Sequence, residues 1–224
     1  MHIGIILDGN RRFAKRLMKE PWKGHEYGVE KVEKLLDWCI ELGVKQLTLY
    51  TLSVDNFNKR PEKELSYLLN LFKKEASNLL DDKKIHENKI RVRFIGRLHM
   101  FDKELQDMMY KLMDQTKQYG NLTVNFAMAY GGREEITDAV KKMIEQGVSA
   151  DHVDMKTISK YLYMSDEPDL IIRTGGEKRS SDFLTFQGAY SELIFLDILW
   201  PEFTKEDLIS CIEEFNERER RFGK

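Results

Sequence analysis

The stretch that decides the fold is residues 3–12, IGIILDGNRR, where an apolar run ends in a carboxylate, a glycine, an amide and two arginines. Ile3–Leu7 is continuous and rich in β-branched residues, which predicts a buried strand of a parallel sheet. Asp8-Gly9-Asn10 is also ordinary turn sequence, and paired arginines are ordinary at a protein surface. Taken alone, the stretch leaves a plain turn and a ligand-binding loop both open.

Strand-like and helix-like segments alternate along the rest of the chain. Apolar runs predict further strands over residues 46–52, 90–95, 122–130, 169–174 and 193–196. Apolar residues at three- and four-residue steps predict helices over about residues 25–42, 62–82, 102–119 and 205–220, and GGREE at 131–135 opens another. This alternation predicts an α/β fold with a central, mostly parallel six-stranded sheet flanked by helices. Without repeats or linkers, residues 1–224 are expected to form one domain.

The bulk composition limits the partners. The 36 basic and 38 acidic residues nearly cancel, which does not support a nucleic-acid-binding protein. No apolar stretch approaches the ~20 residues of a membrane span, and a strand directly after Met1 leaves no room for a signal peptide, so a cytoplasmic location is expected. The five histidines lack the spacing of a zinc site, and Cys39 and Cys211 are expected to be reduced core thiols.

Four polar loops follow predicted strands, at Asp8-Gly9-Asn10, residues 53–60, Gly131-Gly132-Arg133 and Gly175-Gly176-Glu177. In an open parallel sheet these strand ends meet at the edge where α/β proteins bind ligands. Glycine lets backbone N–H groups approach an anion, and the arginine fork matches phosphate oxygens. A carboxylate facing bound phosphates suits Mg²⁺. The edge is therefore predicted to be a Mg²⁺-dependent site for one or two diphosphates.

Each loop is weak evidence alone. Tyr130-Gly131-Gly132-Arg133 fits a strand-to-helix turn as well as an anion-binding nest. The loop after Arg173 favours a functional interpretation, because a cation at the end of a buried strand needs a partner. The chain has no G-x-G-x-x-G after the first strand and no P-loop motif, which argues against NAD and against ATP bound in a P-loop.

Six segments occur in an order that carries a resemblance: DGNRRFA, LSVDNFNKRP, AYGGR, IRTGGEKRSSDF, the pair Tyr190/Glu192 and ERERRFG. With them the chain closely resembles the cis-prenyltransferases of the undecaprenyl diphosphate synthase type, over nearly its whole length. The resemblance implies a Mg²⁺-dependent condensation of isopentenyl diphosphate with an allylic prenyl diphosphate, which releases diphosphate and forms a new cis double bond in each cycle. What accepts the lost proton stays open between the departing diphosphate and a relay through Asn10 and Ser53.

The resemblance also implies roles for individual residues. Asp8 would bind the metal, and Glu192 would support the metal and dimer site. Ser53, Asn56 and Phe57 would belong to a flexible loop that closes over the substrates. The implied catalytic residues are Asp8, Asn10, Ser53 and Asn56. The implied substrate-binding residues are Gly9, Asn10, Arg11, Arg12, His25, Phe57, Arg60, Arg173, Arg179 and Ser181, of which Arg173, Arg179 and Ser181 would bind the isopentenyl diphosphate.

Partners and a tunnel follow from the same resemblance. A homodimer is expected, with Arg221-Phe222-Gly223 reaching the partner's site, and peripheral membrane contact would serve product release. The growing chain needs an apolar tunnel, although apolar residues at helix or strand spacing are more commonly plain core. The residues on suitable elements are Leu65, Leu68, Leu69, Phe72, Phe94, Val124, Phe126 and Met128.

The chain departs from the family pattern at several places. Residues 19–25, KEPWKGH, lack an arginine that relatives often carry, and Lys178 stands where histidine is common. Product length, primer preference and the use of a non-isoprenoid acceptor therefore stay open. A non-catalytic partner subunit is the second hypothesis, but the retention of Asp8, Arg12, Arg173 and Arg179 favours a catalytic chain. A Mg²⁺-dependent phosphohydrolase would leave the RTGGE and ERRFG segments unexplained.

Overall fold

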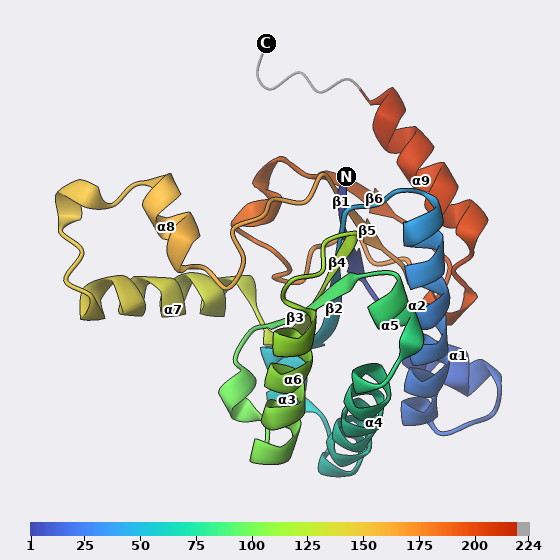
Figure 1. Ribbon diagram of the computed structural model, residues 1–224. Helices are drawn as coiled ribbons and strands as arrows, with labels where there is room; N and C mark the ends of the chain where they lie inside the picture. The colour runs from blue at the N-terminus through green and yellow to red at the C-terminus, as the bar shows by residue number, and fades with distance from the viewer. Residues whose placement is uncertain (219–224) are drawn as a thin grey trace.

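A computed structural model describes residues 1–218, which form a single six-stranded sheet with the strand order β3-β4-β2-β1-β5-β6 (Figure 1). All five strand pairings are parallel, which confirms the predicted α/β class. The strands are β1 (His2–Ile6), β2 (Gln46–Ser53), β3 (Ile90–Ile95), β4 (Leu122–Tyr130), β5 (Leu170–Arg173) and β6 (Glu192–Phe195).

Helices cover the sheet, and α7 and α8 extend together away from it, at the left of Figure 1. The helices are α1 (Asn10–Arg16), α2 (Gly24–Glu41), α3 (Val54–Lys59), α4 (Glu62–Leu80), α5 (Lys83–Glu87), α6 (Lys103–Thr116), α7 (Gly132–Glu145), α8 (Met155–Tyr161) and α9 (Lys205–Glu217). In the described part of the chain, none of these helices has the length and apolarity needed to cross a bilayer.

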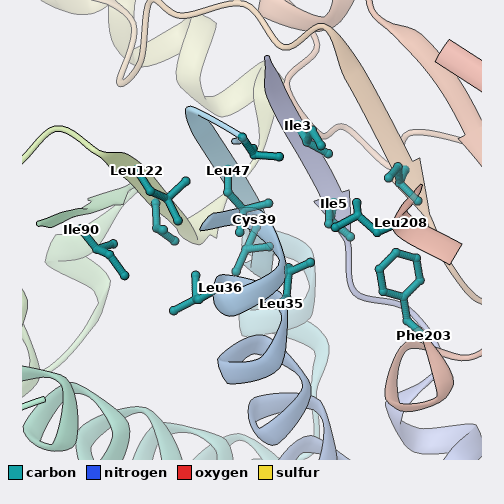
Figure 2. Packing of buried hydrophobic residues seen from close by; sticks show 14 of the residues in the cluster. Ile3, Ile5, Leu35, Leu36, Cys39, Leu47, Ile90, Leu122, Phe203 and Leu208 are labelled. Atoms are coloured by element: carbon teal, nitrogen blue, oxygen red, sulfur yellow. The ribbon is translucent and has the colours of Figure 1, made fainter. Parts of the chain in front are cut away.

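The largest core cluster lies between the sheet and helices α2 and α9, and Figure 2 shows part of it. Ile3 and Ile5 are two residues apart on β1, so both point to the same face and pack with Leu35 of α2 and with Phe203. Cys39 and Cys211 lie unpaired in this cluster, as predicted, and burial raises the pKa of each thiol to about 12.

The structure differs from the sequence-based expectation within residues 53–60, where Val54–Lys59 form helix α3 instead of a loop. The Ser53 hydroxyl accepts a hydrogen bond from the Asn56 backbone N–H at 3.0 Å and so caps the first turn. The helix ends at Lys59 because Pro61 follows Arg60 and disfavours helical backbone there. Short capped helices such as α3, α5 and α8 carry too few periodic residues to be recognised.

The strand registers bring the predicted loops to one edge. Ile6 of β1 pairs with Tyr50 of β2 and with Arg173 of β5, and Ser53 of β2 pairs with Tyr130 of β4. All four strands run in the same direction, so their carboxyl ends, and the loops that follow them, share this edge.

Candidate active site

Asp8 lies at the carboxyl edge between two arginines. Its Oδ1 accepts a hydrogen bond from Arg12 Nη2 at 3.1 Å, and its Oδ2 accepts one from Arg173 Nη2 at 3.0 Å. The Asp8 carbonyl oxygen accepts from Thr174 Oγ1 at 2.7 Å and from the Trp200 N–H at 2.9 Å. The backbone of Asp8 is thus fixed from two directions, while its carboxylate keeps 30% of its surface exposed.

Two glycines allow the segments around Asp8 to approach so closely. Gly9 has a φ of +116°, and a Cβ there would lie 2.8 Å from Leu199 Cβ. Gly175 has a φ of +88°, and a Cβ there would clash with the Arg12 guanidinium and lie 3.0 Å from Asp8 Cγ. Both positions therefore require glycine for conformation and for space.

Arg173 is a buried cation at the end of β5, with only 6% of its side chain exposed. Besides Asp8, its guanidinium donates to the Arg179 carbonyl at 2.6 Å and to Ser181 Oγ at 2.7 Å, whereas Nε has no partner within residues 1–218. The Arg179 side chain is 62% exposed and pairs with Glu177 at 2.5 Å. The Arg173 guanidinium is thus held in one orientation, and Arg179 takes part in this arrangement through its backbone carbonyl.

A second group of charges surrounds Glu64, a buried carboxylate that the sequence patterns did not single out. Arg60 Nη1 lies 2.7 Å from Glu64 Oε1 and 2.9 Å from His25 Nε2, and Arg11 Nε lies 3.6 Å from the same carboxylate oxygen. Burial, together with the charges of Arg60 and Arg11, lowers the pKa of His25 to about 3. The imidazole is therefore neutral, and its Nε2 can accept from Arg60. The four-residue spacing of Arg60 and Glu64 at the start of α4 was the available signal.

Asn10, Ser53 and Asn56 line the same mouth. The Asn10 amide donates to the Leu7 carbonyl at 3.3 Å, and its Oδ1 is buried without a partner among the described residues. Ser53 Oγ accepts a hydrogen bond from the Asn56 N–H, and its hydroxyl also forms a hydrogen bond with the Tyr50 side chain.

One cavity of about 900 Å³ opens at this edge of the sheet. It brings together eleven of the predicted residues: Asp8, Gly9, Asn10, Arg11, Arg12, His25, Ser53, Asn56, Arg60, Arg173 and Ser181. Phe57, Arg179 and Glu192 are not part of its lining. Phe57 packs edge-on against Phe101 instead, with ring centroids 5.5 Å apart.

The cavity continues from this charged mouth into an apolar part between the sheet and helices α2, α4 and α6. Five of the eight residues considered for a tunnel line it: Leu68, Phe72, Phe94, Phe126 and Met128. Val124 is buried in the main core, and Leu65 and Leu69 pack in the cluster around α4 and α6.

Glu192 lies away from Asp8. It opens β6 in the register of Leu170, which pairs with Ile3, so it stands at the amino edge of the sheet. Asp8 follows the opposite end of β1, at least about 10 Å further along the strand direction. Glu192 pairs instead with Arg218 at 2.8 Å. The two carboxylates therefore do not form a common metal site within one chain, and the reason is the strand register, which the sequence does not reveal.

The turn after β4 is already filled by the protein itself. The Gly132 N–H donates to the Asp182 carbonyl at 2.8 Å, and the Arg133 N–H donates to the Asp182 carboxylate at 3.1 Å. The Arg133 side chain is 79% exposed. Of the two interpretations left open, the structure favours a capped strand-to-helix turn over an anion nest.

The donor set can be tested for Mg²⁺. No cluster of three or more His, Cys, Asp or Glu side chains that could hold a metal occurs within residues 1–218. Mg²⁺ is commonly held by one or two carboxylates together with substrate phosphates, and Asp8 offers one part-exposed carboxylate at the cavity mouth. The residues fit a metal that is bound jointly with a diphosphate.

Known proteins match this chain along nearly its whole length. Residues 6–223 match the family described as "Putative undecaprenyl diphosphate synthase". A curated relative from Methanopyrus kandleri, a "tritrans,polycis-undecaprenyl-diphosphate synthase (geranylgeranyl-diphosphate specific)", is 48% identical, covering 100% of this chain and 84% of its own. An isoprenyl transferase from Thermus thermophilus is 46% identical, with coverages of 100% and 88%.

Solved structures of prenyl diphosphate synthases superpose on the whole of this chain. The crystal structure of a probable undecaprenyl diphosphate synthase from Campylobacter jejuni superposes with a TM-score of 0.84 at 31% identity. That of lavandulyl diphosphate synthase from Lavandula x intermedia, in complex with dimethylallyl diphosphate, gives 0.90 at 29% identity. In both cases 100% of this chain and 98% of the other are covered.

Proposed function

The chain belongs to the undecaprenyl diphosphate synthase family of prenyltransferases, and from this premise we propose that it condenses isopentenyl diphosphate with an allylic prenyl diphosphate to give a cis-polyprenyl diphosphate. One observation carries the proposal: Asp8, paired with Arg12 and Arg173, stands at the mouth of a cavity whose inner part is apolar. A charged mouth suits diphosphates, and an apolar interior suits a hydrocarbon chain.

The two diphosphates would bind on either side of Asp8. Arg11 and Arg12 on α1 would bind the allylic diphosphate, and Arg173 with Ser181 would bind that of isopentenyl diphosphate. Asp8 would hold Mg²⁺, which when bound neutralises charge on the departing diphosphate. Arg179 and Ser181 already hold the Arg173 guanidinium in place. Little reorganisation of this side chain is therefore needed when it binds a phosphate.

The chemical step balances without a covalent enzyme intermediate. Diphosphate leaves the allylic carbon with the bonding electrons, the isopentenyl double bond forms the new carbon–carbon bond, and a proton is lost. His25 is unsuited to take this proton, because its pKa of about 3 makes it a weak base and its Nε2 faces Arg60. The Asn10 amide and the Ser53 hydroxyl are also much weaker bases than a diphosphate oxygen, so the departing diphosphate is the acceptor that we favour over a relay through these two residues.

The primer class follows from the relatives. Curated relatives at 43–48% identity carry "geranylgeranyl-diphosphate specific" in their names, so geranylgeranyl diphosphate is the allylic primer that we expect. The test is to incubate the purified protein with Mg²⁺, labelled isopentenyl diphosphate, and geranyl, farnesyl or geranylgeranyl diphosphate. Chromatography of the extracted lipids should show label in polyprenyl products, most of all with geranylgeranyl diphosphate. No label in lipid with any primer would overturn the proposal and leave a non-catalytic subunit.

A homodimer and a peripheral membrane contact complete the proposal. Val140 and Ile144 on the extending helix α7 are exposed apolar side chains, which supports a protein partner there. Arg221-Phe222-Gly223, expected to reach the partner's site, lie outside the described residues. The substrates are water-soluble diphosphates and the product is a lipid, which supports a cytoplasmic enzyme that contacts a membrane to release it. Sedimentation velocity tests the dimer, and co-sedimentation with vesicles tests the contact.

A further inference from the structure

Helix α4 presents one stripe of residues to the inner part of the cavity, and one of them is a carboxylate. The lining residues are Leu68, Leu71, Phe72, Glu75, Ala76 and Leu79. Their positions alternate between steps of three residues and steps of one, as expected for a single helix face. Glu75 is the exception in an otherwise apolar wall, with Phe72 on one side of it and Leu79 on the other.

Helix α2 lines the same cavity with a matching stripe that also contains one carboxylate, Glu33. The two helices are joined near the mouth, where Tyr67 of α4 bonds Glu26 of α2 and Glu64 lies 3.7 Å from His25. Glu33 is exposed to solvent, whereas Glu75 is half-buried. The cavity is therefore lined by an exposed carboxylate on the α2 side and by a half-buried one on the α4 side.

Neither carboxylate is neutralised. Within residues 1–218, no lysine, arginine or histidine forms an ion pair with Glu33 or Glu75, and Glu75 accepts a hydrogen bond from the neutral Asn78 amide at 3.1 Å. A hydrocarbon chain that passes Glu75 would strip water from a charged group without offering a hydrogen bond, which is unfavourable. Glu33 can keep its water because it is exposed.

Glu75 also stands at a defined depth. It lies eleven residues after Glu64, the carboxylate at the mouth, which corresponds to about 16 Å along α4. The wall between them is apolar and would accept hydrocarbon at each added unit. The carboxylate thus marks a depth beyond which further growth stops being favourable.

We propose that Glu75 is a specificity-determining residue, whose charge limits the length of the polyprenyl product. This inference rests on the proposed function, since it concerns the hydrocarbon end of the product that the enzyme makes. The limiting property is the charge of the side chain, not its size.

The test compares Glu75→Gln, Glu75→Leu and Glu75→Ala with the wild type, using labelled isopentenyl diphosphate, the preferred primer and chromatography of the products. Glu75→Gln keeps the shape and removes the charge, so it should lengthen the main product by one or more isoprene units, and Glu75→Leu should do the same. Lys74→Leu is the matched control, because Lys74 is the exposed neighbour and is not part of the cavity lining. It should leave the product length unchanged.

The outcomes separate the inference from its premise. Wild-type products from Glu75→Gln would overturn it, because the charge would then be gone without effect. Longer products from Glu75→Ala or Glu75→Leu beside unchanged ones from Glu75→Gln would show instead that size or polarity is decisive. If Glu75→Leu does not fold, Glu75→Gln still decides the question. A wild-type chain that incorporates no label would overturn the proposed function instead.

Discussion

Strands β4 and β5 each end in a segment with two glycines and an arginine, but the two strand ends are built differently. After β4, the backbone donors of Gly132 and Arg133 are taken by Asp182, and the Arg133 side chain is largely in solvent. After β5, the arginine is buried and turned toward Asp8. The backbone donors are occupied at this end too, since the Gly175 and Gly176 N–H groups donate to the Ile198 and Leu196 carbonyls at 2.7 and 2.8 Å. The two strand ends therefore differ in the placement of the arginine, and a buried cation turned toward Asp8 is the feature that favours an anion site.

The largest expected effect on turnover is for a change at Asp8, the carboxylate that Arg173 contacts at the end of β5. Asp8→Ala removes the one carboxylate between Arg12 and Arg173, so turnover should fall by at least roughly 100-fold, the loss typical of removing one electrostatic partner of a transition state. Initial rates of label incorporation measure it, and a thermal melt checks that the variant is folded. A rate within a few fold of wild type would mean that Asp8 is not part of the reacting site.

Arg173→Lys tests the fork at the end of β5. A lysine keeps the charge but cannot reach Asp8, Ser181 and the Arg179 carbonyl at once, so we expect about a tenfold to 100-fold loss in kcat/KM for isopentenyl diphosphate. Steady-state kinetics with varied isopentenyl diphosphate measure the loss. An unchanged kcat/KM would show that only the charge matters there.

The pH dependence of stability tests the buried histidine at the cavity mouth. The pKa of His25 is about 3 in the folded chain and near 6.5 when unfolded, so below pH 6.5 the unfolded chain takes up a proton that the folded chain does not. Stability should therefore fall as pH is lowered, with His25 contributing about 2 kcal/mol of the loss between pH 7 and pH 5. Denaturant unfolding at both pH values, with His25→Gln as the comparison, measures this contribution. Equal losses in the two proteins would contradict it.

A change at the turn after β4 should lower the stability of the protein and leave its turnover unchanged. Asp182→Ala leaves the Arg133 N–H without its side-chain acceptor and should cost about 1 kcal/mol of unfolding free energy, while the Gly132 N–H keeps the Asp182 carbonyl. Urea denaturation measures the change. A decrease in turnover as large as that of Asp8→Ala would erase the distinction between the two strand ends.

The smallest effect is expected for Arg133→Ala. The Arg133 side chain is 79% exposed, and its guanidinium lies 3.5 Å from the Asp182 carboxylate. The substitution therefore removes one isolated surface ion pair, which contributes about 0–1 kcal/mol to stability. Incorporation rates should stay within about twofold of wild type. A loss comparable to that of Arg173→Lys would place a substrate phosphate at the β4 side as well.

The comparison also indicates what a sequence can reveal. Strands such as Ile3–Leu7 and the polar loops that follow them could be predicted, because each is marked by residues that are neighbours in the sequence. The cap on α7 was not, because Asp182 lies 49 residues from Arg133. Glu64 was overlooked for the same reason, since its partners Arg11 and His25 come from two other segments. Glu192 was expected at the metal and dimer site, and only the register of β6 reveals that it lies away from Asp8 within one chain.

The contact between Asp8 and Arg173 spans 165 residues of sequence, and the Asp8 carbonyl also accepts a hydrogen bond from the N–H of Trp200. During synthesis at about 5–20 residues per second, the first strand leaves the ribosome roughly ten to thirty seconds before these partners exist. A nascent chain therefore has no assembled reaction centre until most of its length has emerged. The contacts that fix Asp8 can therefore be completed only late in synthesis, when the segment from Arg173 to Trp200 packs against the end of the first strand.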